Sequence, residues 1–228
     1  MSPVDPQLLE DFRDGLRIMD RLGLTAAFGH LSARLTGEAF LMTPAFGPGM
    51  AGCEDLVILD LKGTRIGGAE RPLALERFLH AGVYRSRPEV GAVCRTHSRA
   101  CVSWGASGKP LPLLHGFGLM LGRTVPCFPE IDLVHDPESG ERVAAALGRE
   151  TALLLRGNGA FAVGDSLRNA VVHALYLEEA ASIGLDLGID GTRDAVSEAD
   201  QQLRQRWHAN ERPRAWAYYR WKASGPEH

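Results

Sequence analysis

Four side chains able to take part in acid–base or ion-pair chemistry fall within one short stretch of the chain. Glu76 and His80 are four residues apart, a spacing that places both on one face of a helix. Arg95 and His97 end an apolar run, and because alternate residues of a strand share a face, both should look into the same space. The stretch predicts a Glu76/Arg95/His97 cluster in a functional site. The alternative is a structural Glu76–Arg95 ion pair beside which His97 fills a gap.

A second group of candidate residues comes earlier, in the run GHLSAR at 29–34. On a strand, Ser32 and Arg34 share a face, and a hydroxyl beside a guanidinium suits an anionic group. A solvated strand face has the same spacing, so both interpretations stay open. The Gly/Pro-rich loop at 43–49 is either a substrate-holding loop with free backbone N–H groups or an ordinary surface turn.

A third motif, RGNG at 156–159, lies between two apolar runs. Asparagine and glycine supply the positive backbone φ angles that a tight turn needs. Taken alone, the motif predicts a β-hairpin.

Helices and strands alternate around these motifs. Helical periodicity and capping residues predict helices at 6–22, 73–84, from about 98, 137–147, 166–187 and 197–207, with Pro213 interrupting the last one. Runs rich in β-forming residues between turn residues predict strands at 31–35, 39–42, 55–61, 90–95, 152–155 and 160–163. Thr36-Gly37 is expected to form the turn between the first two strands. The alternation predicts a layered α/β sandwich in a single domain, 1–228, with 197–228 as a helical tail.

Composition excludes several classes of protein. The chain has 228 residues, 25 Lys and Arg against 28 Asp and Glu, and a net charge of −3, which leaves no basic footprint for a nucleic acid. No apolar run reaches the ~20 residues that span a bilayer. Four cysteines without paired spacing do not form a disulfide framework. We expect a cytoplasmic protein with no membrane and no nucleic-acid partner.

Taken in order, the motifs resemble the class II aldolase/adducin family over roughly residues 8–187. The segments that carry the resemblance are GHLSAR, MTP, EDLVILDLKG, LERFLHAGVYRSRPEVGAVCRTHS, LLLRGNGAFAVG and LYLEEAA. The resemblance implies a three-layer αβα sandwich with a central, mainly antiparallel sheet, assembled as a homotetramer with active sites between neighbouring subunits. The family includes metal-dependent aldolases, sugar-phosphate epimerases, decarboxylases of hydroxylated aromatic acids and the non-catalytic adducins.

The resemblance also implies a metal site, from which this chain departs. In the family, a glutamate at the position of Glu76 acts as acid/base, and three histidines bind a divalent cation. Here the His-x-His pair reads Arg95-Thr96-His97 and the third histidine position is Asn158. Arginine has no lone pair to donate, and zinc needs three or four donors. We therefore expect no cofactor; if Zn, Mn or Fe is bound, Glu76 and His97 are the expected ligands.

The substrate side departs from the family too. A serine pair and a Thr/Ser-Gly that hold phosphate in sugar-phosphate members are replaced here by Ala74-Leu75 and Ala45-Phe46. His30 stands where the aldolases have asparagine. These changes predict a flatter substrate without phosphate. The residues expected to bind it are His30, Ser32, Arg34, Thr43 and His115, of which His115, like His80, is also a candidate substitute metal ligand.

The sequence thus predicts a carbon–carbon lyase, a decarboxylase or retro-aldolase, that acts on a small hydroxylated carboxylic acid, aromatic acids included. Arg95 would bind the substrate carboxylate or enolate and supply charge in place of part of the metal site, Asn158 would donate a hydrogen bond, and Glu76 or His97 would move the proton. A non-catalytic adducin-like scaffold is the alternative, as is isomerase, cyclase or oxygenase chemistry on the same fold. The aromatic tail would pack on a subunit interface or supply Tyr218 or Tyr219 to a neighbour's site.

Overall fold

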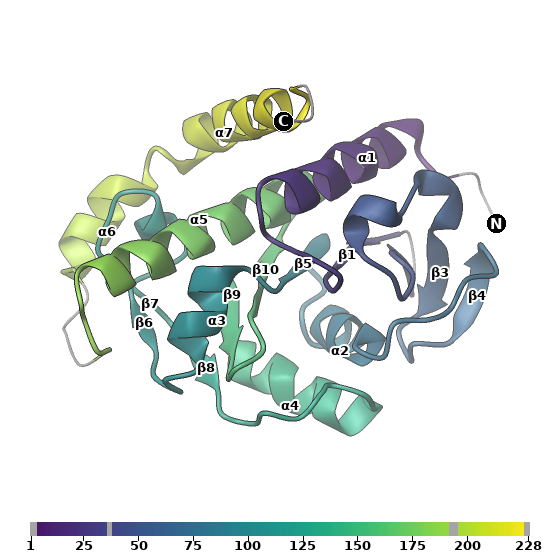
Figure 1. The fold of residues 1–228 in the computed structure, drawn as a ribbon, viewed down its shortest axis with the longest axis horizontal. Helices are drawn as coiled ribbons and strands as arrows, with labels where there is room; N and C mark the ends of the chain where they lie inside the picture. The colour runs from purple at the N-terminus through teal and green to yellow at the C-terminus, as the bar shows by residue number, and fades with distance from the viewer. Residues whose placement is uncertain (1–3, 36–37, 192–195, 226–228) are drawn as a thin grey trace.

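The central element of the structure is a sheet with strand order β4-β3-β2-β1-β5-β10-β9-β8 (Figure 1). The computed structural model describes residues 4–35, 38–191 and 196–225. The strands are β1 (His30–Arg34), β2 (Ala39–Met42), β3 (Val57–Asp60), β4 (Arg65–Gly68), β5 (Ala92–Thr96), β8 (Cys127–Phe128), β9 (Ala152–Leu155) and β10 (Ala160–Gly164). Neighbouring strands are antiparallel, except that β8 and β9 are parallel. The predicted, mainly antiparallel sheet is confirmed.

Helices cover both faces of this sheet. They are α1 (Pro6–Arg21), α2 (Arg77–Ser86), α3 (Arg99–Gly105), α4 (Pro137–Leu147), α5 (Leu167–Asp186), α6 (Glu198–Gln205) and α7 (His208–Ala223). Three short 3₁₀ turns, η1 (Pro48–Met50), η2 (Cys53–Asp55) and η3 (Gly118–Met120), and a small ribbon of β6 (Leu111–Pro112) and β7 (Thr124–Val125) complete the described elements.

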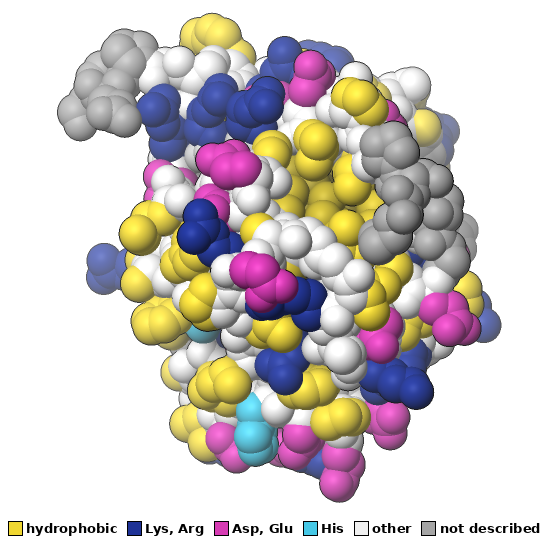
Figure 2. All heavy atoms as spheres, turned by 90° about the vertical axis from the view of Figure 1, so that its right-hand side faces the viewer, with side chains coloured by type: hydrophobic (Ala, Val, Ile, Leu, Met, Phe, Trp, Pro, Cys, Tyr) yellow, Lys and Arg dark blue, Asp and Glu magenta, His cyan; other side chains and the backbone are white. Residues whose placement is uncertain are grey.

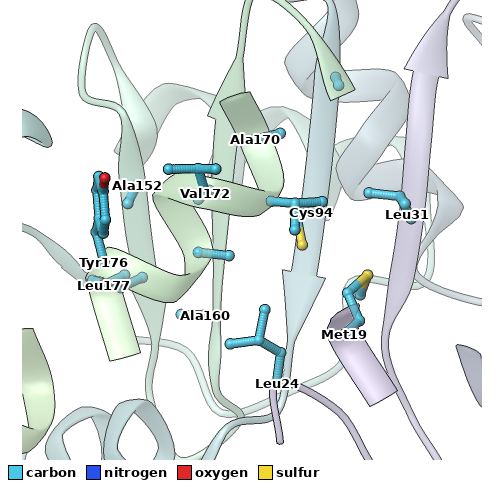
Figure 3. Close-up of a cluster of buried hydrophobic side chains, with 14 of the residues drawn as sticks. Met19, Leu24, Leu31, Cys94, Ala152, Ala160, Ala170, Val172, Tyr176 and Leu177 are labelled. Carbon is cyan, nitrogen blue, oxygen red and sulfur yellow. The ribbon is translucent and has the colours of Figure 1, made fainter. Parts of the chain in front are cut away.

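Two hydrophobic cores separate the layers. One lies between the sheet and α1, α3, α5 and α7, and the other lies between the sheet and α2 and α4. Figure 3 shows part of the first core, where Leu31 of β1 and Cys94 of β5 lie among side chains that include Met19 of α1 and Ala170 of α5. Because successive strand residues point to opposite faces, Val93 belongs to the second core. The three-layer αβα sandwich is therefore confirmed.

The predicted helix starts follow from their capping residues. Asp5 accepts a hydrogen bond from the N–H of Gln7, with a proline at the first helical position of α1. Ser166 accepts from the N–H of Asn169 and starts α5. Asp5 and Ser166 are thus the N-caps of the helices predicted at the start of the chain and from residue 166, and Gly23, with φ of 73°, follows α1.

Two predicted helix features are wrong. The structure starts α2 at Arg77 rather than at residue 73, and Glu76 is the residue that caps it. Residues 71–74 have no regular secondary structure, and the carbonyl of Pro72 accepts a hydrogen bond from the N–H of Ala45 instead of from a helical turn. Pro213 lies inside α7 instead of interrupting a helix, since packing of Trp216 and Ala223 in the first core holds α7. The predicted Thr36-Gly37 turn lies outside the described residues.

The molecular surface beside β3 and β4 is mixed in character. Figure 2 shows Lys, Arg, Asp and Glu side chains interspersed on this face, around a hollow with apolar side chains. A groove at this end of the sheet is lined by Leu9, Leu41, Leu56 and Ile58. None of the helices that the structure describes combines the length and the apolar character needed to cross a bilayer.

A buried histidine makes the packing of α5 sensitive to acid. His173 Nδ1 bonds to the carbonyl of Val163 at 2.8 Å, and burial lowers the pKa of His173 to about 4. An unfolded histidine titrates near ~6.5, so between these two values the unfolded state binds more protons than the folded state. The free energy of unfolding must therefore fall as the pH drops from 7 towards 4.

We predict that His173 alone lowers the free energy of unfolding by about 2 kcal/mol at pH 5 relative to pH 7. Urea unfolding at both pH values measures this difference. His173→Asn keeps an N–H donor for Val163 and removes the titrating group, so it should lose correspondingly less stability on acidification. An equal loss in both proteins would contradict the assignment.

Candidate active site

A cavity of about 360 Å³ opens where β1, β5 and the β9–β10 turn meet the start of α2. Four polar residues line it: His30, Glu76, His97 and Asn158. Apolar side chains form the rest of the lining: Ala27, Phe28, Ala45, Phe46, Ala74, Leu75 and Leu133. The cavity thus has one polar edge and apolar walls.

Strand register brings the polar edge together. His30 of β1 and Phe161 of β10 both pair with Arg95 of β5, one from each side. His97 follows β5 directly, and its N–H bonds to the carbonyl of Leu24 at 2.9 Å. The sheet therefore fixes the backbone positions of His30 and His97 around that of Arg95.

Asn158 reaches the cavity because its two neighbours are glycines. Gly157 and Gly159 have φ angles of 66° and 77°, which only glycine adopts readily. A Cβ on Gly159 would lie 2.2 Å from the carbonyl oxygen of Thr96, so a side chain there could not fit beside the end of β5. The predicted β-hairpin is confirmed, but its positive φ angles belong to Gly157 and Gly159 and not to Asn158, which its tip brings to the cavity.

The corner after β5 is anchored from the opposite layer. Glu178 of α5 accepts hydrogen bonds from the N–H groups of Ala100 at 2.8 Å and Cys101 at 3.0 Å. These N–H groups belong to the first turn of α3, where no intrahelical acceptor exists for them. Glu178 thereby fixes the start of α3 and, with it, the position of His97.

Arg95 lies beneath the cavity rather than in its lining. Its side chain is 0 % exposed, and its Nε and Nη2 donate to Glu76 Oε1 at 3.4 and 3.2 Å. Its Nη1 donates to the carbonyl oxygens of Thr96 and Ala160. The guanidinium is therefore held by the protein's own acceptors, in the Glu76–Arg95 ion pair that was one of the two sequence interpretations. It is not placed to touch a substrate, because it does not reach the cavity surface.

The two histidines of the polar edge are poor proton acceptors. Burial, followed by the nearby positive charge of Arg95, lowers the pKa of His30 to about 3. Burial, followed by Arg95, lowers the pKa of His97 to about 4, against a smaller opposite effect of Glu76. Both rings are thus neutral at neutral pH, where each offers one N–H donor and one lone pair. His97, which the sequence suggested as one of two groups that could move the proton, therefore has a pKa well below the ordinary histidine value of ~6.5.

Four residues predicted to bind substrate lie outside the lining. Ser32 is fully buried and bonds to His80 and Tyr84. Thr43 accepts a hydrogen bond from the N–H of Leu31 at 3.1 Å. These two hydroxyls serve the protein's own structure.

Arg34 and His115 also make hydrogen bonds within the protein, away from the cavity. Arg34 donates to the carbonyls of Val90, Tyr84 and Arg87, which ties β1 to the end of α2. His115 lies beside η3, where its Nε2 accepts from the N–H of Gly118 at 3.3 Å. Alternation along the strand correctly placed Ser32 and Arg34 on one face, but that face is covered by α2.

Sequence reasoning missed two walls of the cavity, Phe28 and Leu133. The ring of Phe28 lies 6.1 Å from that of His97, and the Phe28 side chain is 70 % exposed. Phe28 directly precedes the GHLSAR run, and this position beside a candidate motif could have indicated that it lies at the site. Leu133 comes from an irregular segment between β8 and α4 that carries no local pattern.

In chemical terms, the site offers one carboxylate, two neutral imidazoles and one amide against an apolar surface. No Lys or Arg is among the residues that line the cavity. The arrangement can accept or return a proton at Glu76 and donate hydrogen bonds to an oxygen that gains negative charge.

Comparison with known proteins gives three findings. The sequence profile of the "Class II Aldolase and Adducin N-terminal domain" matches residues 11–185. A 3,4-dihydroxyphthalate decarboxylase of Terrabacter sp. is 29% identical over 196 residues, which cover 80% of this chain and 82% of that protein. A 5-methylthioribulose-1-phosphate/5-deoxyribulose-1-phosphate aldolase of Rhodospirillum rubrum is 30% identical over 173 residues, covering 74% of this chain and 76% of the relative.

Solved structures agree on the fold. An L-fuculose 1-phosphate aldolase from Glaciozyma antarctica superimposes with a TM-score of 0.79 at 22% identity, covering 98% of this chain and 92% of the other. At that identity the likeness speaks for the fold alone.

Proposed function

Because the chain belongs to the class II aldolase and adducin family, we propose that it is a carbon–carbon lyase acting on a small hydroxylated carboxylic acid. The observation that carries the proposal is the cavity itself, in which Glu76, two neutral histidines and Asn158 face apolar walls. Relatives named as decarboxylases and as an aldolase support the reaction class. Within that class, the walls favour decarboxylation of a hydroxylated aromatic acid.

The apolar walls argue against a phosphorylated substrate. A phosphate dianion needs cationic side chains or several free N–H donors, whereas Ala45-Phe46 and Ala74-Leu75 occupy this part of the lining. Phe28 and Leu75 instead present flat and aliphatic surfaces that suit a ring. A carboxylate that leaves as carbon dioxide loses its charge in the transition state, so an apolar wall favours that state over the bound substrate.

In this reaction the protein must stabilise negative charge on an oxygen and move a proton. In a retro-aldol cleavage, the electron pair of the breaking carbon–carbon bond moves to a carbonyl oxygen, and the carbon left behind then receives a proton. In a hydroxylated aromatic acid, a proton must first move from a ring hydroxyl to the ring carbon that carries the carboxylate, so that the hydroxyl oxygen becomes a carbonyl. Carbon dioxide then leaves, and the electron pair of the broken bond moves to that oxygen, which becomes a phenolate. Asn158 and the N–H groups of the neutral histidines donate hydrogen bonds to that oxygen. Glu76 moves the proton; Arg95 holds its Oε1, and its Oε2 lies 3.9 Å from His30 Nδ1.

The residues present do not fit the family's divalent metal. Arg95 and Asn158 stand at two of the three histidine positions, and the Arg95 guanidinium is ion-paired to Glu76. A dication on Glu76 would meet that like charge within a few ångströms. Among the residues that the structure describes, no three His, Cys, Asp or Glu side chains come together as metal ligands. We propose that the positive charge of Arg95 takes over part of the role of the metal.

A scaffold role is less well supported than catalysis. In a non-catalytic adducin-like descendant, we would expect the polar groups of the cleft to have been lost. The cleft instead keeps a carboxylate that is 5 % exposed and paired with a buried guanidinium, an arrangement that is costly to maintain without use.

We also propose the family's assembly, a homotetramer in the cytoplasm with active sites between subunits. The cavity rim carries the exposed apolar side chains of Phe28 and Leu75. A second hollow, of about 380 Å³, is lined by Phe117, Tyr218 and Tyr219, and His115 lies beside Phe117; in the assembly that we propose, this hollow faces the neighbour's rim. Light scattering measures the molar mass, and a monomer would overturn this assembly.

We predict that purified protein releases carbon dioxide, or an aldehyde, from at least one member of a panel of hydroxylated aromatic and aliphatic acids. Glu76→Gln should lower the rate roughly 10²–10⁴-fold, because the proton-moving group is lost. Glu89→Gln makes the same change on an exposed carboxylate and should leave the rate unchanged. A Glu76→Gln variant with the parent rate would contradict the role of Glu76.

We predict that the double substitution Arg95→His/Asn158→His creates a zinc site, because Glu76, His97 and the two new imidazoles then supply four donors. Elemental mass spectrometry after zinc loading should find about one ion per chain in the double variant and none retained by the parent protein. The single variant Asn158→His keeps the guanidinium and should not retain zinc. Stoichiometric zinc in the parent protein would overturn the proposal for Arg95.

A further inference from the structure

A chain of buried polar groups lies behind the cavity. Ser32 Oγ is 2.7 Å from His80 Nδ1 and 2.7 Å from the hydroxyl of Tyr84. The exposed fractions of the three residues are 0, 0 and 1 %. Because Tyr84 is buried at the far end, the chain does not lead to solvent; it can only fix hydrogen-bond directions.

At the end of this network nearest the cavity, two ring nitrogens lack a hydrogen-bond partner among the described residues. His80 Nε2 and His30 Nδ1 are buried, and neither makes a hydrogen bond to any residue in the described part of the chain. The two rings are 6.1 Å apart, edge to face, and His30 Nδ1 is 3.9 Å from Glu76 Oε2. A buried polar atom left without a hydrogen-bond partner destabilises the folded state.

One water molecule would satisfy all these groups. A direct N–H···N bond between two imidazoles brings their centres to roughly 5 Å, and a hydrogen bond to a carboxylate is about 2.9 Å long. Both separations here are longer than a direct hydrogen bond allows, so a hydrogen-bonded connection between these groups needs a bridging molecule. Buried waters typically have two to four polar partners, and this position offers three.

The relative strength of the donors decides which group donates and which accepts in each hydrogen bond of this buried network. A phenol is a stronger donor than an alcohol, so Tyr84 donates to Ser32 and the hydroxyl hydrogen of Ser32 is left for His80 Nδ1. Burial lowers the pKa of His80 well below its ordinary value and that of His30 to about 3, so both rings are neutral. A neutral His80 that accepts at Nδ1 carries its proton on Nε2.

We propose that a water molecule is bound between His80 Nε2, His30 Nδ1 and Glu76 Oε2. Through this water, the hydrogen-bond directions of the buried network set which ring nitrogen of His30 carries the proton. The water accepts from His80 Nε2–H and donates to Glu76 Oε2 and to His30 Nδ1. His30 must then carry its proton on Nε2, the nitrogen left for the cavity that His30 lines. Ser32, His80 and Tyr84 are thus positioning residues that make His30 a donor to the oxygen that gains charge.

The catalytic consequence rests on the proposed function, but the tautomers do not. Nitrogen-15 NMR of histidine-labelled protein separates protonated from unprotonated ring nitrogens. We expect Nε2–H for both His80 and His30 at pH 7. Ser32→Ala removes the donor to His80 Nδ1, so His80 should change to a mixture of tautomers, and His30 should follow.

Two further variants sharpen the test. Ser98→Ala removes another buried serine hydroxyl, one with no hydrogen bond to either ring among the described residues, and should leave both tautomers unchanged. His80→Asn retains a group that can bond to Ser32 and deletes the Nε2 side, so it should change the His30 tautomer even if Ser32→Ala does not fold. Nδ1–H on His30 in the parent protein, or a His30 tautomer indifferent to both variants, would overturn the proposal.

Activity gives the second readout. With a substrate found, Ser32→Ala should lower kcat about 10-fold with KM nearly unchanged, because the lost donor acts in the transition state. A rise in KM alone would contradict the role of His30. If no substrate is turned over, the lyase assignment fails, whereas the NMR result still decides the proposal for the chain.

Discussion

The buried ion pair between Arg95 and Glu76 is the constraint on which the rest of the site depends. A guanidinium without exposure loses its hydration, and several kcal/mol per ion must be recovered from fixed acceptors. The carbonyls of Thr96 and Ala160 and one oxygen of Glu76 are those acceptors. They come from β5, β10 and the start of α2, so the ion pair forms only when strand register and helix start are both correct.

The same cation sets the character of its neighbours. His30 and His97 lie close enough to Arg95 for its charge to add to the effect of burial, which keeps both rings neutral. A site with a second cation at neutral pH would suit a phosphate or a dianion. This site has one carboxylate, neutral donors and apolar walls, and is suited to a substrate that spreads or loses charge as it reacts.

Local patterns determined most of the fold, and long-range packing determined what the site residues touch. Asp5 and Ser166 start their helices where the sequence predicts, because a cap depends on residues within one turn. Strand alternation placed Ser32 and Arg34 on one face. Whether that face meets substrate or α2 depends on the layer above it, which no local pattern records. Leu133 joins the cavity through packing of a distant irregular segment and had no signal in the sequence.

The departures from the family's pattern are consistent with one another in physical terms. A guanidinium at Arg95 and a bound dication would repel each other, so the loss of a histidine at one position removes the benefit of a histidine at Asn158. In the reaction that we propose, hydrogen-bond donors stabilise the charge on the reacting oxygen, and Asn158 and His30 are side chains of that kind at the cavity surface. Without phosphate-binding serines, the walls are free to become apolar, as Leu75 and Phe46 are. Each change alone would weaken a metal-dependent site for sugar phosphates. Together the changes give a different site, which contains one fixed cation, one carboxylate and neutral hydrogen-bond donors.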